Sequence, residues 1–225
     1  MKALRPILLA LIFSPVLASA QANDPGAWYS YFGNVRATDS KFSLDIEAQY
    51  RNHDFGGDMQ QLLVRSGIKY DFADNFNATV GYAFVQSEAE SEPDNPTREN
   101  RIYQEGVLSQ NTGRFFFRHR FRYEQRFREG QDFNTRYRYC LFLDVPLNKP
   151  TLEKNAVYLA LYNEIFINGI KTDDTPGVFD RDRIYLGAGY RITSSLGIQL
   201  GWMNQILENS SKSQLMLSVH HKLKL

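Results

Sequence analysis

The sequence of 225 residues is poor in features that mark several common classes of protein. Cys140 is the single cysteine, so no disulfide can form within the chain and no cysteine cluster can hold zinc or an iron–sulfur centre. An excess of one charge is missing too, because 26 Lys and Arg side chains are balanced by 25 Asp and Glu side chains. Nucleic-acid binding requires a clear excess of positive charge. We therefore expect no nucleic-acid partner, no metal site and no cofactor.

A long apolar run is also missing. A helix that crosses a bilayer needs about 18 consecutive apolar residues, and the sequence has no such run. At the amino terminus, Lys2 and Arg5 precede a short apolar run at residues 7–13, and an Ala-Ser-Ala motif follows at 18–20. This order is typical of a secretory signal peptide. We therefore predict that residues 1–20 are a signal peptide and that the mature chain is exported.

What the sequence has instead is alternation with a period of two. Between Arg114 and Arg128 the odd positions are mostly aromatic and the even positions mostly charged. A strand points successive side chains to opposite faces, so this segment predicts a strand with one apolar face and one ionic face. Its length suits a strand that crosses a bilayer at a tilt. We expect the ionic face to point into a barrel.

Similar alternating segments recur from residue 41 to the carboxyl terminus. We predict an all-β, antiparallel up-and-down transmembrane β-barrel over residues 41–225, most simply with ten strands. The expected strands lie near residues 42–51, 61–72, 76–84, 100–110, 114–128, 135–145, 157–167, 184–192, 196–206 and 215–225.

The breaks between these segments alternate in length. Tight turns are expected at 73–75, 111–113 and 193–195, with a longer break at 147–154 at the same end. The breaks at the opposite end are mostly longer and polar. Outer-membrane barrels have short periplasmic turns and longer external loops. Both ends of a ten-stranded barrel would then lie on the periplasmic side.

Residues 28–35 do not fit this arrangement. They carry aromatic side chains on both faces, and as an eleventh strand they would have to begin outside the cell. We therefore expect residues 21–40 to form a periplasmic or lumenal segment beside the barrel. A count of twelve strands is the alternative, if this segment contributes to the wall after being split.

Trp28 near the mature start, the segment from Phe42 to Arg51 and the succession of strands to the carboxyl terminus together resemble a bacterial family. This is the family of outer-membrane β-barrels catalogued as domain of unknown function 2490, and the resemblance covers nearly all the mature chain. It implies a barrel in the outer membrane of a Gram-negative cell and carries over no catalytic residue. The partners expected there are outer-membrane lipid, lipopolysaccharide and the barrel assembly machinery.

A second hypothesis is an outer-membrane enzyme that modifies lipid A or phospholipid. Barrels of the lipid A deacylase and outer-membrane phospholipase kinds place a Ser and a His on the lipid-facing side. His119 lies on the aromatic face, but the positions two residues away are Phe117 and Phe121. No nucleophile is placed beside the histidine, so we predict no catalytic site.

The ionic faces of the expected strands converge on the lumen, which is the candidate functional site. Charges of both signs are present, and buried charges are costly unless they are paired. A paired network would either fill the barrel as a rigid structural plug or line a narrow, porin-like pore that prefers anions. The predicted charged cluster consists of Arg118, Arg120, Arg122, Glu124, Arg126, Arg136, Arg138, Asp144 and Glu164.

A third hypothesis keeps the barrel but makes it soluble. A periplasmic, lipocalin-like barrel would turn its aliphatic face inward and its charges outward, and alternation alone does not decide between the two arrangements. The expected strand count and the many tyrosines on the apolar face favour the membrane arrangement, because aromatic girdles flank the apolar band of outer-membrane barrels.

Overall fold

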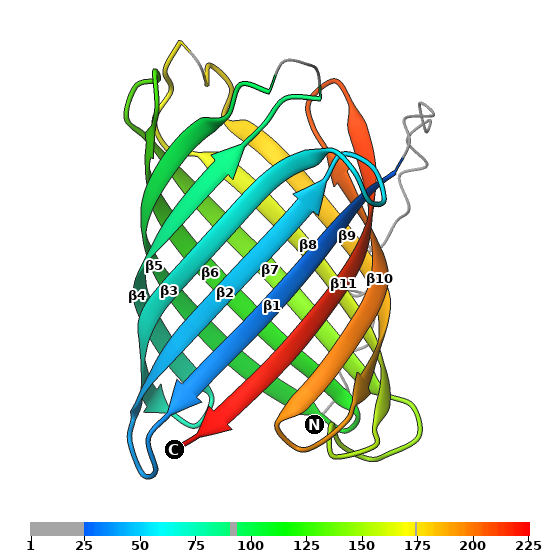
Figure 1. Ribbon diagram of the computed structural model, residues 1–225. Coiled ribbons are helices and arrows are strands. Elements are labelled where there is room, and N and C mark those ends of the chain that lie inside the picture. Colours follow the sequence, from blue (N-terminus) through cyan, green and yellow to red (C-terminus); the bar gives the residue numbers. More distant parts are fainter. Residues whose placement is uncertain (1–24, 91–93, 174) are drawn as a thin grey trace, which may run out of the picture.

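The computed structural model describes residues 25–90, 94–173 and 175–225. Within this part of the chain the regular structure consists of strands that close into a barrel (Figure 1). The strands are β1 (Gly26–Arg36), β2 (Phe42–Asn52), β3 (Met59–Ala73), β4 (Phe76–Ser87), β5 (Thr97–Thr112), β6 (Phe115–Arg128), β7 (Asn134–Pro146), β8 (Val157–Asn168), β9 (Phe179–Arg191), β10 (Leu196–Ile206) and β11 (Ser211–Lys224). The described residues contain no helix long and apolar enough to cross a membrane.

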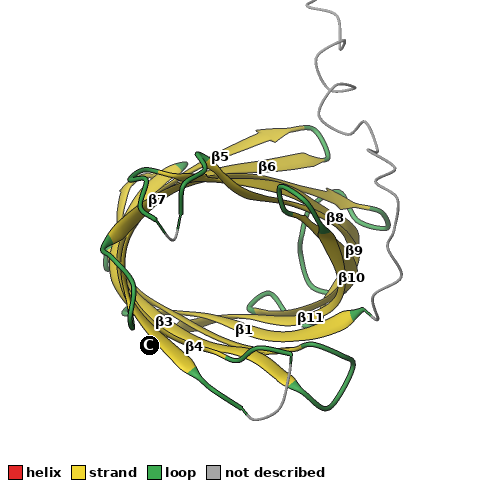
Figure 2. Cartoon of the chain, turned by 90° about the horizontal axis from the view of Figure 1, so that it is seen from above, coloured by secondary structure: helices red, strands yellow, loops and turns green. Residues whose placement is uncertain are grey.

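Each strand pairs antiparallel with its neighbours in sequence, and the ring is completed by β1 and β11, which run parallel. The register of this parallel seam is continuous from Gly26 opposite Gln214 to Arg36 opposite Lys224. The view along the barrel axis shows the closed ring (Figure 2). The prediction of an all-β closed barrel is confirmed.

The predicted strand counts of ten and twelve are wrong, because the barrel has eleven strands. The additional strand is β1, which lies within the segment 21–40 that we expected to find beside the wall. An even number follows only if the first and last strands close antiparallel, and parallel closure removes that condition. Strand β1 has aromatic residues on both faces because the part of the lumen that it lines is itself aromatic. Tyr29 points outward, whereas Trp28 and Phe32 point into the lumen.

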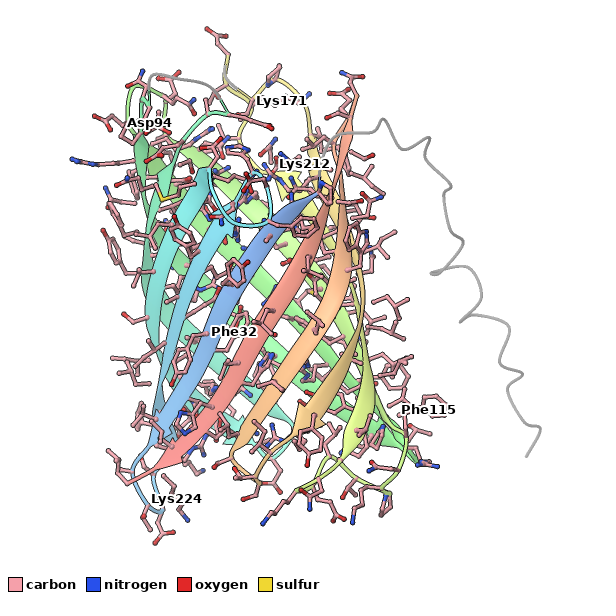
Figure 3. All side chains as sticks on the ribbon, turned by 45° about the vertical axis from the view of Figure 1, so that its right-hand side comes forward. Phe32, Asp94, Phe115, Lys171, Lys212 and Lys224 are labelled. Atoms are coloured by element: carbon pink, nitrogen blue, oxygen red, sulfur yellow. The ribbon has the colours of Figure 1, made fainter. Side chains whose placement is uncertain are left out.

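The two ends of the barrel differ as the break lengths predicted. Lys41 and Leu225 both lie at the end with the tight turns, where the backbone NH of Thr38 donates to the carbonyl oxygen of Leu225 (2.9 Å). Most of the longer loops gather at the other end, near Asp94, Lys171 and Lys212 (Figure 3), whereas residues 147–156 form a long connection at the tight-turn end. Strand β1 starts at this long-loop end, opposite to the carboxyl terminus (Figure 1).

The apolar face of the strands points outward. Ile68, Val80 and Leu200 are between 54% and 63% exposed, whereas Arg65 on the opposite face of β3 is 7% exposed and Glu124 is 1% exposed. The described strands therefore have the reverse of the lipocalin-like arrangement, and that hypothesis is wrong about which face is inside. In a closed barrel every second residue of each strand faces the lumen, and the residues between them face outward.

A belt of aromatic side chains lies at each end of the outward apolar face. At the short-turn end, the ring of Tyr70 lies 4.8 Å from the rings of both Phe42 and Phe72. Toward the long loops, Tyr123 packs on Tyr137 with ring centroids 5.0 Å apart. A rise of about 3.3 Å per residue and a tilt of about 40° place Phe42 and Tyr50, at opposite ends of β2, about 20 Å apart along the axis. Leu44, Ile46 and Ala48 fill the outward positions between them.

Candidate functional site in the lumen

All nine residues of the predicted charged cluster face the lumen from neighbouring strands. Five come from β6, three from β7 and one from β8. The strand register places them on one wall, since Arg122 is opposite Arg138, and Cys140 is opposite both Arg120 and Glu164. Sequence alternation placed these residues on one face of their strands, but it could not assign the ion pairs between them.

Glu124 is the centre of the charged cluster. Its carboxylate, 1% exposed, accepts hydrogen bonds from Arg136 Nη2 (2.6 Å) and Arg138 Nη1 (2.6 Å). The Nη1 atom of Arg122 lies 3.8 Å from the same carboxylate. Three guanidinium groups thus surround one buried carboxylate, which offsets part of the cost of removing these charges from water.

Glu164 extends the network across to β8. Its Oε1 atom accepts from Arg120 Nη2 and from Arg138 Nη2, both at 2.6 Å. Arg138 therefore links Glu164 to Glu124. At the short-turn end, Asp144 accepts from Arg118 at 3.1 Å. Six residues of the predicted cluster therefore form one connected network of ion pairs, namely Arg120, Arg122, Glu124, Arg136, Arg138 and Glu164. The pair of Arg118 with Asp144 is separate from it.

Three acidic partners of these arginines were absent from the predicted cluster. Glu105 pairs with Arg122, Glu99 accepts from Arg126 (2.5 Å) and from Arg101 (2.7 Å), and Asp180 accepts from Arg136 (2.8 Å). The register across the hairpin of β5 and β6 decides the face of Glu99 and Glu105, and the turn length left this register open. Asp180 lies beside a β-bulge, where strict alternation is interrupted.

The wall formed by β1 and β8–β11 is partly aromatic and apolar, although it also carries Glu164 and Arg183. Trp28, Tyr185, Met203 and Met216 belong to one buried cluster there. Glycine lets the tyrosine rings of this wall lie close to the backbone: a Cβ atom at Gly187 would collide with the ring of Tyr185. The rings therefore follow the wall and do not cross the lumen.

Between the two walls lies a cavity of about 720 Å³. Its lining extends from Thr97 and Gln131 near the long loops to Asn34, Ser109 and Lys222 near the short turns. Fifteen of the lining residues are Lys or Arg and seven are Asp or Glu. The cavity is therefore a long, predominantly basic space.

The outer face holds the histidine of the enzyme hypothesis. His119 Nδ1 is 2.8 Å from the hydroxyl oxygen of Tyr139, which is also on the outer face. Glu105 is on the inward face and cannot orient this histidine. Among the described residues, the side-chain hydrogen bond of His119 is therefore with a tyrosine and not with a serine nucleophile.

A metal site was not expected, and the described residues contain no group of three or more His, Cys, Asp or Glu side chains placed to hold an ion. The adjacent His220 and His221 point to opposite faces, since His220 stacks on lumenal Phe32 while His221 contacts the hydroxyl of outward Tyr31.

Comparison with known proteins and protein families gives one match, which is to a family. The chain matches no curated protein and no solved structure. The family described as "Protein of unknown function (DUF2490)" matches residues 25–216, from just before β1 into β11. The match covers most of the chain and nearly the whole barrel, and it begins at the strand that completes the parallel seam. The chain therefore belongs to the DUF2490 family.

Proposed function

We propose that the protein is an outer-membrane β-barrel whose lumen is a narrow path for small anions. The observation that carries the proposal is the outward apolar band between two aromatic belts on a closed barrel. Soluble monomers rarely expose continuous apolar surface larger than a few hundred Å². In an outer membrane this surface would contact lipid, and the aromatic belts would lie at the two interfaces.

The charge of the lumen supports the second part of the proposal. The cavity lining reaches toward both mouths, and basic residues outnumber acidic ones in it by about two to one. A confined path with an excess of fixed positive charge attracts anions and repels cations. The alternative structural role is a barrel closed by its own ion pairs.

Membrane location is tested by fractionation of cells that express the full chain. We expect the protein in the outer-membrane fraction, with a gel mobility that changes on heating as the barrel unfolds. Recovery of a folded, heat-insensitive protein in the periplasmic fraction would contradict the proposal.

Selectivity is tested by recording single barrels in a planar bilayer under a KCl gradient. We expect a small, steady current whose reversal potential indicates a preference for chloride, because Arg120 and Arg122 face the cavity. A silent wild type, together with current through the Arg120→Ala, Arg122→Ala double variant, would identify a plug. A current that prefers cations would be incompatible with a path along these arginines.

Catalysis at the outer face is a separate test. We expect the purified barrel to release no fatty acid from phospholipid or lipid A in a manner that depends on His119, since the hydrogen-bond partner of His119 is Tyr139. The measurement compares wild type with His119→Ala and with Tyr139→Phe at equal folded fractions. Hydrolysis that disappears in His119→Ala alone would establish the enzyme hypothesis.

A further inference from the structure

Seven arginines of the described residues are buried, and their charge partners divide them into two groups. Five of them have a carboxylate oxygen within 4.0 Å, namely Arg65, Arg101, Arg122, Arg126 and Arg136. Arg51 and Arg183, which are 8% and 7% exposed, have no such carboxylate in the described part of the chain. A buried cation without a neutralising anion is costly, so these two need a specific explanation.

Arg51 is held by amide side chains alone. Its Nε and Nη2 atoms donate to Gln49 Oε1, and its Nη1 atom donates to Gln61 Oε1 at 2.6 Å. The acid nearest in this chain of contacts is Glu47, which accepts from the amide of Gln49 (2.6 Å) and pairs with Arg65. Glu47 is thus committed to another arginine, and the charge of Arg51 is fixed in position without being neutralised.

Arg183 forms no ion pair with a carboxylate of the described residues, although its direct cross-strand neighbour is a glutamate. Glu164 lies opposite Arg183 in the register of β8 and β9, but its carboxylate accepts from Arg120 and Arg138. The described contacts give Arg183 one side-chain hydrogen bond, from Nε to Gln205 Oε1 at 2.9 Å. Both terminal nitrogens of its guanidinium therefore keep donors for another molecule.

Trp28 brings the two arginines to one place. The guanidinium carbon of Arg51 is 3.9 Å from the centroid of the Trp28 ring, and that of Arg183 is 4.9 Å from it. The two guanidinium carbons are therefore no more than about 9 Å apart, within the range of cation–π contact on one indole. All three residues line the cavity, in the part nearer the long loops, where β1 begins and β2 ends.

We propose that Arg51 and Arg183, positioned by Trp28, bind a small oxyanion that carries a phosphate or carboxylate group. The planar fork of a guanidinium matches the paired oxygens of either group. A doubly charged phosphate in contact with both arginines would balance both charges, and a carboxylate would balance one of them. Met216, which is opposite Trp28 in the seam, and Tyr162 provide an apolar surface beside it for the rest of an organic ligand. The inference rests on the proposed function only in taking the lumen as open to solutes.

The test uses the fact that the chain has two tryptophans. Trp202 is outward and 43% exposed, so Trp202→Phe leaves Trp28 as the single indole emitter in the folded, full-length barrel. Inorganic phosphate and acetate are titrated separately at constant ionic strength made up with KCl. We expect a saturable change in Trp28 fluorescence with at least one of them, and the tighter of the two identifies the oxyanion class.

Arg51→Gln and Arg183→Gln should each weaken this binding by about tenfold or more, because each removes a charge-assisted hydrogen-bond donor. Equilibrium dialysis with radiolabelled phosphate or acetate supplies a readout that is independent of changes around Trp28. The matched control is Arg118→Gln, a lumenal arginine that already has a carboxylate partner in Asp144, and it should alter the affinity by less than about twofold.

Equal weakening in all three variants would indicate general attraction by a basic lumen and would overturn the site, as would the absence of saturable binding. Bilayer currents from the same preparation separate this result from the proposed function. Anion current without saturable binding overturns the site and keeps the pore. Saturable binding without current keeps the site and contradicts the pore.

Discussion

Leu200→Arg should prevent or severely weaken folding of the barrel into lipid. Leu200 is an outward residue near the middle of β10 and is 54% exposed. Its side chain would contact hydrocarbon if the apolar band spans the membrane. Arginine at the bilayer midplane of such a barrel costs about 2–4 kcal/mol, and the measurement is the free energy of unfolding by denaturant in lipid vesicles.

Two controls make this result specific to lipid contact. Leu200→Ala removes apolar contact without adding charge and should cost clearly less than the arginine variant. Gln199→Arg places the same charge on the inward face, where Gln199 lines the cavity, and should be tolerated better. If Gln199→Arg is the more damaging substitution, the membrane-facing role of the outer surface is wrong.

The second large effect is expected from Glu124→Gln. The substitution leaves Arg136 and Arg138 without the buried carboxylate that accepts from both, and Arg122 loses a neighbour of opposite charge. Breaking a buried pair from one side costs about 3–5 kcal/mol, because the remaining charge stays out of water. The denaturant midpoint of the variant should fall accordingly.

A surface ion pair offers the matched comparison. Glu153 pairs with Lys149 at 3.6 Å in the exposed turn between β7 and β8, and Glu153→Gln should change stability by less than about 1 kcal/mol. Adding Arg138→Gln to Glu124→Gln should restore part of the loss, since the excess of buried positive charge around position 124 is then smaller by one. A Glu124→Gln variant as stable as Glu153→Gln would mean that water enters the network and screens it.

Most of the fold was predicted from the alternation of apolar and polar residues with a period of two. From Phe42 onward it located ten strands and distinguished their two faces, because any strand with a lumenal and an outer side must alternate. It failed for β1, whose inward Trp28 and outward Tyr29 are both aromatic. A pattern based on polarity cannot assign faces where the lumen itself is aromatic.

The sequence predicted which charged residues lie on the lumenal face, but it did not predict which of them form ion pairs with one another. Alternation placed Arg118 to Arg126 on one face, yet which carboxylate pairs with which arginine depends on register across hairpins and on the bulge beside Asp180. Arg51 and Arg183, for which the described residues provide no carboxylate within 4.0 Å, could not have been distinguished from the other lumenal arginines in the sequence. Glu164 is the neighbour of Arg183 across the strands, and only the side-chain geometry reveals that it pairs elsewhere.

The parallel seam has a consequence for assembly. It joins residues 26–36 to residues 214–224, the pairing with the greatest separation along the chain, so the ring cannot close before the last strand exists. Each hairpin can enter a bilayer by carrying only its own loop across. Strand β1, by contrast, starts at the mouth opposite to Leu225, so in a membrane Gly26 would have to reach that side before the seam could form. If the barrel spans a membrane, its closure would therefore be coupled to the transfer of the start of β1 to the far side.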